Sequence, residues 1–410
     1  MKQVLSVIIV IITTVSMCGC LGPHSPDEYG FVLAIGVDEG ENNTFCISFM
    51  LQGEPSGESG VSEGGAMIIA TEADSIFSAV DALRTIYPHY LNFSHAYAIY
   101  VSKTVAQSEL MERFFEFAPE TLSLRQSVGL IVTDCTAKEY INERAKIKYV
   151  NLSEIGQELL KISNTTGSTP VATLLDYKAA LYENEHDAIV PSVLIDYTLE
   201  KNETGDGTSG TNDAFAQPGT ERSGSETSGY KLISGGETRC TVRGCALFNN
   251  GKMVGQLDVP HTQALMLARG EFRKGIVRII VNDSIIELEV KAKRRPSVKI
   301  DMETGRANVK IEIRAQVITD ENGISDDDLG AIERKFADEM TQKLLKVEEI
   351  CLQSGCDGMK LARAAKKCFL TNEEWENFDW QNFFVNTKTE FDIVIELTQN
   401  IYLRHRGNRA

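Results

Sequence analysis

NVKIEIRAQVIT, residues 308–319, is the stretch that decides the fold of this chain. From Val309 to Val317 its apolar side chains alternate with charged or polar ones, which predicts a strand in a sheet with one buried and one solvated face. Residues 326–328, all Asp, then place negative charge where the positive end of a helix dipole is expected. A long helix is predicted there because apolar residues recur at helical spacing: Ile332, Phe336, Met340, Leu344, Val347 and Cys351.

Further strands are predicted on both sides of this strand and helix. Residues 275–281, 285–293 and 390–404 all have strand-like apolar patterns. We therefore expect residues 271–410 to form a C-terminal domain of antiparallel sheet plus one long helix.

The preceding residues, 136–270, predict a middle α/β domain. Residues 136–184 are mostly helical in pattern. Residues 189–197 predict a strand, and Pro191 favours an edge position for it because proline lacks the N–H that a central strand needs.

A hairpin and a long loop complete this middle domain. Residues 241–249 and 253–258 are strand-like and are joined by Asn250-Gly251, a dipeptide typical of a two-residue turn. Residues 201–236 are rich in Gly, Ser, Thr, Asn and Glu and have hardly an apolar side chain. Such a segment cannot offset its own ordering entropy, so we expect a mobile loop inside the domain.

Residues 29–135 predict an N-terminal α/β domain. Residues 31–37 and 44–52 flank a turn and predict a hairpin. The elements after it alternate in type: strand 66–71, helix 74–87, strand 95–102, helix 104–117 and strand 127–134. The predicted fold class is therefore mixed α/β, with three domains in series, each a mixed or antiparallel sheet with packed helices.

Residues 1–19 have the composition of a lipoprotein signal peptide. An early positive charge is followed by an apolar run, residues 4–12, and then by Gly19-Cys20. We expect cleavage after Gly19 and a diacylglyceryl group on the Cys20 thiol, with further acylation of the freed amine. Residues 20–28 are then a lipidated tether. The alternative is an uncleaved membrane helix, but a span needs about 20 apolar residues and Ser and Thr interrupt this run.

The charge of the chain argues against nucleic acid as a partner. The sequence holds 41 Lys and Arg against 58 Asp and Glu, a net charge of −17, whereas nucleic acids and anionic headgroups select basic surfaces. After Cys20, no other segment is apolar over the length of a membrane span. We therefore expect a body of two or three domains that only its lipid holds to the membrane.

The cysteines predict neither a full disulfide framework nor a zinc site. Of the nine cysteines, one is lost by cleavage and one by lipidation, which leaves an odd number. Cys240 and Cys245, like Cys351 and Cys356, have four residues between them, more than zinc knuckles use, and no histidine lies close by.

A search for catalytic motifs finds none. The six histidines lie in no metal or catalytic spacing, and no zinc-protease, nucleophile-elbow, phosphate-loop or dinucleotide-binding motif is present. His95 begins an apolar strand, where we expect a buried histidine with satisfied hydrogen bonds. Residues 320–328 are acidic, but the position of Gly323 does not fit a calcium loop. We therefore predict a protein that is not an enzyme and needs no cofactor or metal.

The densest aromatic cluster lies near the C-terminus, and its members are Trp375, Phe378, Trp380, Phe383 and Phe384. Such clusters fill cores, and they also anchor partners. Both interpretations stay open here, with Trp375, Trp380 and Phe383 as the candidate partner contacts.

Several of these segments, taken in order, resemble the Ger(x)C family of spore germination lipoproteins. The resemblance rests on Cys20, the turn at residues 35–40 and Phe93-Ser94-His95 in the first half of the chain. In the second half it rests on the hairpin at Ala246-Leu247-Phe248 and 251–257, the helix at 262–269, Trp375, Asp379-Trp380, Phe383-Phe384 and Arg406-Gly407. The chain departs from the family directly after Cys20, where Leu21-Gly22 replaces the usual Trp-Asp pair.

The resemblance implies a C subunit of a nutrient germinant receptor, anchored by lipid on the outer face of a spore inner membrane. In this family such a subunit acts with two membrane-embedded subunits, of types A and B, and has no known catalytic role. The resemblance also implies three domains of mixed α/β character.

Two other functions compete with this one. A lipoprotein that captures a small nutrient itself needs a concave pocket with convergent polar groups. An envelope hydrolase needs a nucleophile with a base, or a set of metal ligands, and the sequence offers neither in a recognisable arrangement.

Overall fold

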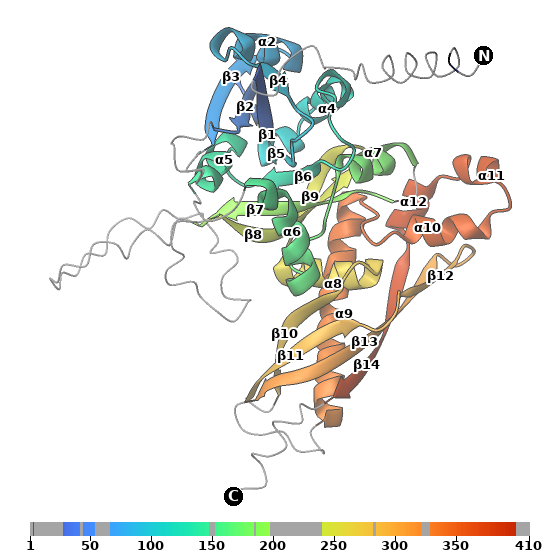
Figure 1. The fold of residues 1–410 in the computed structure, drawn as a ribbon. Helices are drawn as coiled ribbons and strands as arrows, with labels where there is room; N and C mark the ends of the chain where they lie inside the picture. Colours follow the sequence, from blue (N-terminus) through green and yellow to red (C-terminus); the bar gives the residue numbers. More distant parts are fainter. Residues whose placement is uncertain are drawn as a thin grey trace, which may run out of the picture.

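A computed structural model describes residue 3 and residues 28–41, 44–53, 66–146, 152–183, 186–196, 240–281, 284–320 and 329–398. These residues form two sheets with helices packed on them (Figure 1). The mixed α/β class predicted from the sequence is therefore confirmed. The expected signal peptide, the Cys20 tether, the loop 201–236 and the acidic residues 326–328 lie outside the described residues.

The first part of the chain builds a nine-stranded sheet. Its strands are β1 Tyr29–Glu39, β2 Phe45–Leu51, β3 Met67–Ala73, β4 Tyr90–Asn92, β5 Ala98–Ser102, β6 Gly129–Thr133, β7 Ile189–Ile195, β8 Cys240–Asn249 and β9 Lys252–Asp258. The strand order is β3-β2-β1-β5-β6-β7-β8-β9, with β4 paired to β1. The central strands β1, β5, β6 and β7 are parallel, while antiparallel pairs complete both sides.

Helices cover both faces of this sheet. They are α2 Ile76–Ile86, α3 Lys103–Ala106, α4 Leu110–Thr121, α5 Ala137–Ala145, α6 Leu152–Thr166, α7 Leu174–Glu183 and α8 Val259–Arg269. One core joins the sheet to α2, α4 and α7, and a second, on the other face, joins it to α5 and α6. Buried faces on both sides explain why the central strands are almost continuously apolar.

Two sequence features fix the geometry around this sheet. Asn250 and Gly251 both have positive φ angles, of 48° and 78°, which is the turn that joins β8 to β9 in register. Asp38, at the end of β1, accepts hydrogen bonds from the backbone N–H groups of Ala137 (2.6 Å) and Lys138 (2.9 Å). A residue of the first strand therefore caps the start of α5.

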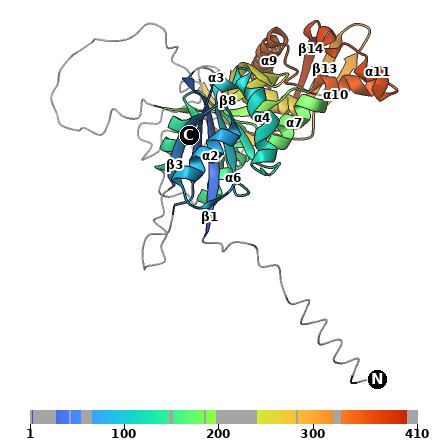
Figure 2. The ribbon, with the colours of Figure 1, turned by 90° about the horizontal axis from the view of Figure 1, so that it is seen from above.

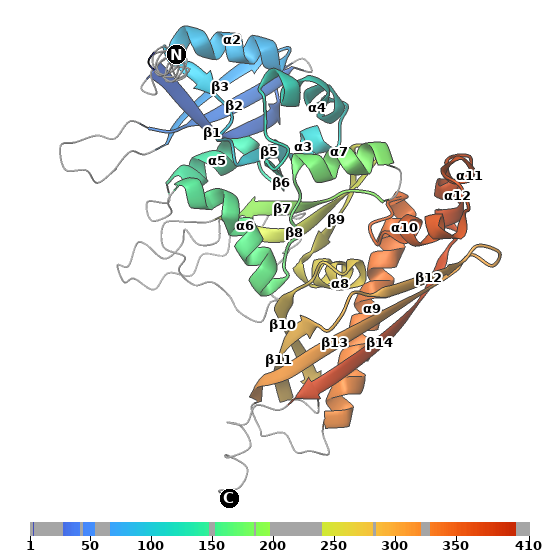
Figure 3. The ribbon, with the colours of Figure 1, turned by 45° about the vertical axis from the view of Figure 1, so that its right-hand side comes forward.

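The last part of the chain builds a five-stranded sheet covered by one long helix. Its elements are β10 Lys274–Val281, β11 Ser284–Ala292, β12 Ser297–Asp301, β13 Arg306–Asp320, α9 Leu329–Ser354, α10 Leu361–Ala365, a 3-10 turn Lys366–Cys368, α11 Asn372–Glu376, α12 Trp380–Val385 and β14 Lys388–Thr398. The predicted stripe on α9 is buried against the sheet. Figures 2 and 3 show this unit to one side of the nine-stranded sheet, with α2 at the opposite end of the molecule.

The prediction of an edge strand at Pro191 is wrong, because β7 lies between β6 and β8. The proline is tolerated because β6 pairs with β7 only at Ser192 and Val193, just after it. The missing N–H therefore falls where the parallel ladder has not yet begun.

The sequence pattern predicted a purely antiparallel C-terminal sheet, and this prediction is wrong. β14 runs parallel to β13 over the whole length from Arg306 to Gln316. The reason is the connection, since α9 carries the chain back along the sheet and a helical crossover returns a strand in the same direction.

Other boundaries also differ from the prediction. The predicted helix 104–117 is two helices, α3 and α4, and β12 was not predicted. The boundary expected between residues 135 and 136 falls inside the nine-stranded sheet, because β6 and β7 are neighbours in it. The N-terminal and middle segments therefore share one sheet.

Candidate binding surfaces

The aromatic cluster predicted near the C-terminus is assembled by two short helices, α11 and α12. Thr371 and Glu374 form a capping box that begins α11, and the Asp379 side chain caps α12. These caps bring the rings of Trp375 and Trp380 to 5.7 Å between centroids. The aromatic residues that lie close together in the sequence therefore also contact one another in the structure.

The members of this cluster differ in exposure. Trp375 is only 5% exposed and packs with Ala362 and Ala365, so its side chain fills a small core. Trp380 and Phe383 are half-buried, with ring centroids 5.8 Å apart. The Trp380 indole N–H is buried and has no hydrogen-bond partner among the described residues. Of the three candidate contacts, Trp380 and Phe383 alone reach the surface.

One surface residue beside this cluster was missed by the sequence analysis. Leu370 is 93% exposed, and it directly precedes the capping box of α11. Leu370 directly follows Phe369, and so short an apolar run has no periodic pattern that distinguishes a surface residue from a core residue. We define Leu370, Trp380 and Phe383 as the aromatic rim.

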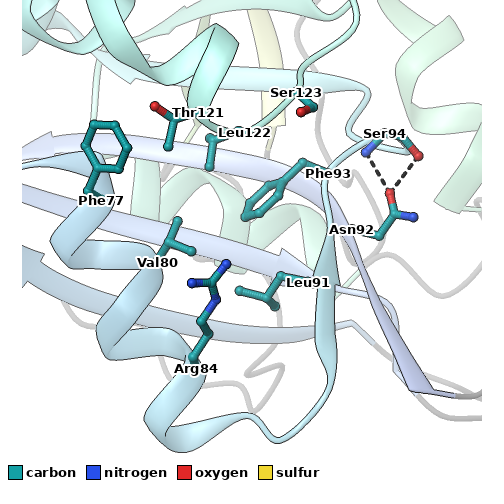
Figure 4. Close-up of a pocket in the computed structure, with 10 residues that line it drawn as sticks. All are labelled: Phe77, Val80, Arg84, Leu91, Asn92, Phe93, Ser94, Thr121, Leu122 and Ser123. Atoms are coloured by element: carbon teal, nitrogen blue, oxygen red, sulfur yellow. Dashed lines mark hydrogen bonds between the residues drawn. The ribbon is translucent and has the colours of Figure 1, made fainter. Parts of the chain in front are cut away.

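A groove of about 400 Å³ lies at the opposite end of the molecule, beside α2 and β4 (Figure 4). Phe77, Val80 and Leu91 give it apolar walls. The guanidinium of Arg84 points toward the space between Val80 and Leu91, as Figure 4 shows, and forms no ion pair with the described residues. A small molecule with an apolar part and one anionic group fits this composition.

The turn beside the groove contains the Phe93-Ser94-His95 motif. Asn92 accepts hydrogen bonds from the backbone N–H of Ser94 (2.9 Å) and from its hydroxyl (2.6 Å), which holds the turn. His95 is exposed and its ring contacts Phe31 edge to face, with centroids 4.9 Å apart. The prediction of a buried histidine is therefore wrong, because the strand begins only at Ala98, after the turn.

A polar network lies where the parallel strands β5 and β6 end. Gln256 accepts from the Lys103 ammonium (3.1 Å) and donates to Asp134 (2.8 Å) and Ser192 (2.6 Å). Arg243 forms an ion pair with Asp134 at 2.7 Å. Carboxyl ends of parallel strands often bind ligands, but these side chains hydrogen-bond one another. The network therefore links α3, β8 and β9 to the centre of the sheet.

A second polar network joins the two sheets. Asp187, just before β7, accepts a hydrogen bond of 2.6 Å from the backbone N–H of Asp357, just after α9. The Asp357 carboxylate accepts from two backbone N–H groups at the start of α10, at 2.8 and 2.6 Å. Glu271 forms ion pairs with Arg269 (2.9 Å) and Lys360 (2.6 Å) alongside. Burial raises the pKa of Asp187 to about 7 and that of Asp357 to about 6.

We expect Asp187→Asn to stabilise the protein, and to do so more at alkaline pH. The folded state holds the Asp187 proton more tightly than the unfolded chain, so native stability falls as pH rises from about 4 to about 7. Asparagine keeps the acceptor and removes the charge. The gain in the free energy of unfolding should reach roughly 2 kcal/mol at pH 8 and be smaller at pH 5. Urea unfolding at both pH values measures it, with exposed Asp338→Asn as the control. An equal gain at pH 5 and pH 8 contradicts this assignment.

No group of three or more His, Cys, Asp and Glu side chains in the described part of the chain is arranged to hold a metal ion. The seven cysteines that are described are all free thiols. No described helix combines the length and the apolar composition needed to cross a membrane.

Comparison with known proteins gives two family matches and one structural match. Residues 24–195 match the model described as "Spore germination protein N-terminal domain", and residues 243–400 match "Spore germination B3/GerAC like, C-terminal". A solved structure titled "Crystal Structure of the GerBC protein" has a TM-score of 0.52 and 15% identity, and covers 88% of this chain and 96% of that one. No curated protein matches the chain. At 15% identity the structural match shows only that the two proteins share a fold. Membership of the family rests on the two family models, which match most of the chain.

Proposed function

Because the chain belongs to the GerAC-like family of spore germination proteins, we propose that it is a lipid-anchored, non-catalytic C subunit of a nutrient germinant receptor. The observation that carries this proposal is the order of the two family matches, which together cover most of the chain and begin shortly after Cys20. The subunit is proposed to lie on the outer face of the spore inner membrane and to act with membrane-embedded subunits of types A and B.

The lipid anchor is proposed from the sequence around Gly19 and Cys20. Two or three acyl chains on one cysteine hold a protein firmly to a bilayer, whereas a single chain is marginal. The anchor confines the body to the surface where the membrane-embedded subunits lie, and so raises their effective concentration for one another. In this proposal the lipid on Cys20 is the one chemical modification on which the function depends.

The aromatic rim is the surface we propose for contact with a partner subunit. Interfaces are enriched in aromatic side chains that sit on a rigid base. Trp380 packs on the buried Trp375 and Phe384, and Phe383 packs on Trp380. Leu370 follows Phe369, a member of the same cluster, and adds an exposed apolar side chain beside it.

We expect Leu370→Asp to weaken copurification of the membrane-embedded subunits with this protein by about tenfold. A charge placed at an apolar contact costs at least about 1.4 kcal/mol, which corresponds to that factor. Leu345→Asp is the matched control, since Leu345 is also an exposed leucine, 40% exposed on the long helix α9. Equal recovery of the partners with both variants contradicts the assignment of this surface.

Direct capture of a nutrient is a second candidate function, and the groove beside Arg84 is the observation that favours it. It predicts heat on titration of the purified protein with small anionic nutrients, and loss of that heat in Arg84→Gln. No heat and no thermal shift with amino acids, sugars or nucleosides contradicts it.

A further inference from the structure

At one end of the nine-stranded sheet, the start of β1 lies beside β4. Tyr29 and Tyr90 are paired in register across these two parallel strands, and their ring centroids are 6.2 Å apart. The end of α2 is close by, because the Tyr87 ring lies on Gly30, where an added Cβ would come within 2.1 Å of it. We call this surface, made of Tyr29, Ile86, Tyr87, His89 and Tyr90, the β1 end.

Large apolar and aromatic side chains face solvent at the β1 end. Ile86 is 65% exposed and Tyr90 is 53% exposed. Tyr87 and His89 stand side by side, with ring centroids 4.8 Å apart. Tyrosine has an apolar ring and a polar hydroxyl, and side chains of this kind concentrate at the level of lipid headgroups.

The charge of this region sets it apart from the rest of the chain. Acidic residues number 58 in the whole sequence, yet residues 82–108 contain none. The charged and titratable side chains of that stretch are instead Arg84, His89, His95 and Lys103. A membrane surface with negative potential repels carboxylates. The exposed Glu28, next to Tyr29, is the one acidic side chain beside the five described residues of the β1 end, so this surface approaches the membrane at little electrostatic cost.

The tether limits how far the β1 end can lie from the membrane. Glu28, the first residue of the described body, lies eight residues after Cys20. Eight residues span at most about 28 Å when fully extended. The five-stranded sheet lies at the far end of the molecule from α2 and β1 (Figure 3). An anchor at Cys20 therefore keeps the β1 end within reach of the lipid and favours contact there over contact at that sheet.

We propose that the β1 end rests in the headgroup region of the membrane, with the side chains of Ile86 and Tyr90 in contact with lipid. This inference rests on the proposed anchor at Cys20 and adds an orientation to it. The contact holds the nine-stranded sheet next to the bilayer. The occupant of this surface is lipid, and a second protein there is an alternative outcome of the test.

Tryptophan fluorescence in vesicles tests this orientation with the full lipidated protein. Tyr90→Trp and Ile86→Trp each place an indole at the β1 end, and Tyr182→Trp places one on α7 at a position that is 76% exposed. The variants are reconstituted in phosphatidylcholine vesicles that carry bromine on the acyl chains, which quenches nearby indoles. The signal of the native Trp375 and Trp380 is common to all variants and is subtracted.

Each outcome of this experiment decides a different point. We expect the added indole of Tyr90→Trp and Ile86→Trp to lose most of its emission, and that of Tyr182→Trp to keep it. If the variants float with the vesicles but bromine quenches none of the three added indoles, the proposed orientation is wrong and the proposed anchor is not contradicted. A protein that does not float with the vesicles overturns the anchor, and this inference with it. Quenching by added membrane subunits rather than by bromine identifies a protein occupant and overturns the lipid contact.

Discussion

Replacing Cys20 with Ala should release this protein from the membrane and impair germination in response to nutrients. Without the thiol no thioether to a diacylglyceryl group can form, so the acyl chains are absent. Each buried methylene of an acyl chain contributes about 0.8 kcal/mol to membrane binding, so loss of the chains shifts the protein almost wholly to the soluble fraction. Fractionation of spore membranes measures the release, and the optical density of a germinating spore suspension measures the function.

A second cysteine provides the control for this experiment. Cys368 is an exposed free thiol in the C-terminal unit, so Cys368→Ala removes a cysteine without touching the anchor. It should leave both the membrane fraction and germination unchanged. A Cys20→Ala protein that stays in the membrane fraction and remains fully active contradicts the proposed function.

The largest effect on stability is expected from Gly244→Ala, in the strand β8. Gly244 has φ +139°, a conformation that L-residues rarely adopt, and an added Cβ would lie 2.2 Å from the carbonyl oxygen of Leu257. That oxygen belongs to the backbone of the neighbouring strand, so it cannot move without breaking the ladder between β8 and β9. We expect a loss of about 4 kcal/mol or more in the free energy of unfolding, measured by urea denaturation.

Gly305→Ala separates backbone strain from the steric clash. Gly305 also has a positive φ, of +67°, but the nearest atom to an added Cβ is 3.9 Å away. Its substitution should cost only about 1 to 2 kcal/mol, the ordinary penalty of the left-handed conformation. Equal losses in the two variants contradict the argument that the contact with Leu257 is the main cause.

Periodicity and turn chemistry predicted the local elements of this fold well. The alternating residues of β13, the stripe on α9 and the Asn250-Gly251 turn are short-range signals, and each formed the element expected. The direction of β14 and the central position of β7 depend on which strands meet across the whole chain. No local pattern contains that information, and Pro191 favoured the wrong position because the short overlap with β6 could not be foreseen.

The candidate binding surfaces were predictable only in part. The residue types of the aromatic cluster were visible in the sequence, but their burial was not, since Trp375 is buried and Phe383 is half-buried although both are aromatic residues of short helices. The groove beside Arg84 brings α2 and β4 together with the end of α4, about 30 residues further along the chain. The β1 end brings the same two elements together with β1, which lies far before them in the sequence. Surfaces of this kind arise from tertiary packing and become visible only in the structure.

Mass spectrometry of the protein purified from spore membranes tests the central claim most directly. The account predicts an N-terminal peptide that begins at Cys20 and carries a diacylglyceryl group, in a preparation that also contains the two membrane-embedded subunits. An N-terminus upstream of Cys20, or an unmodified Cys20 in a protein recovered alone, contradicts it.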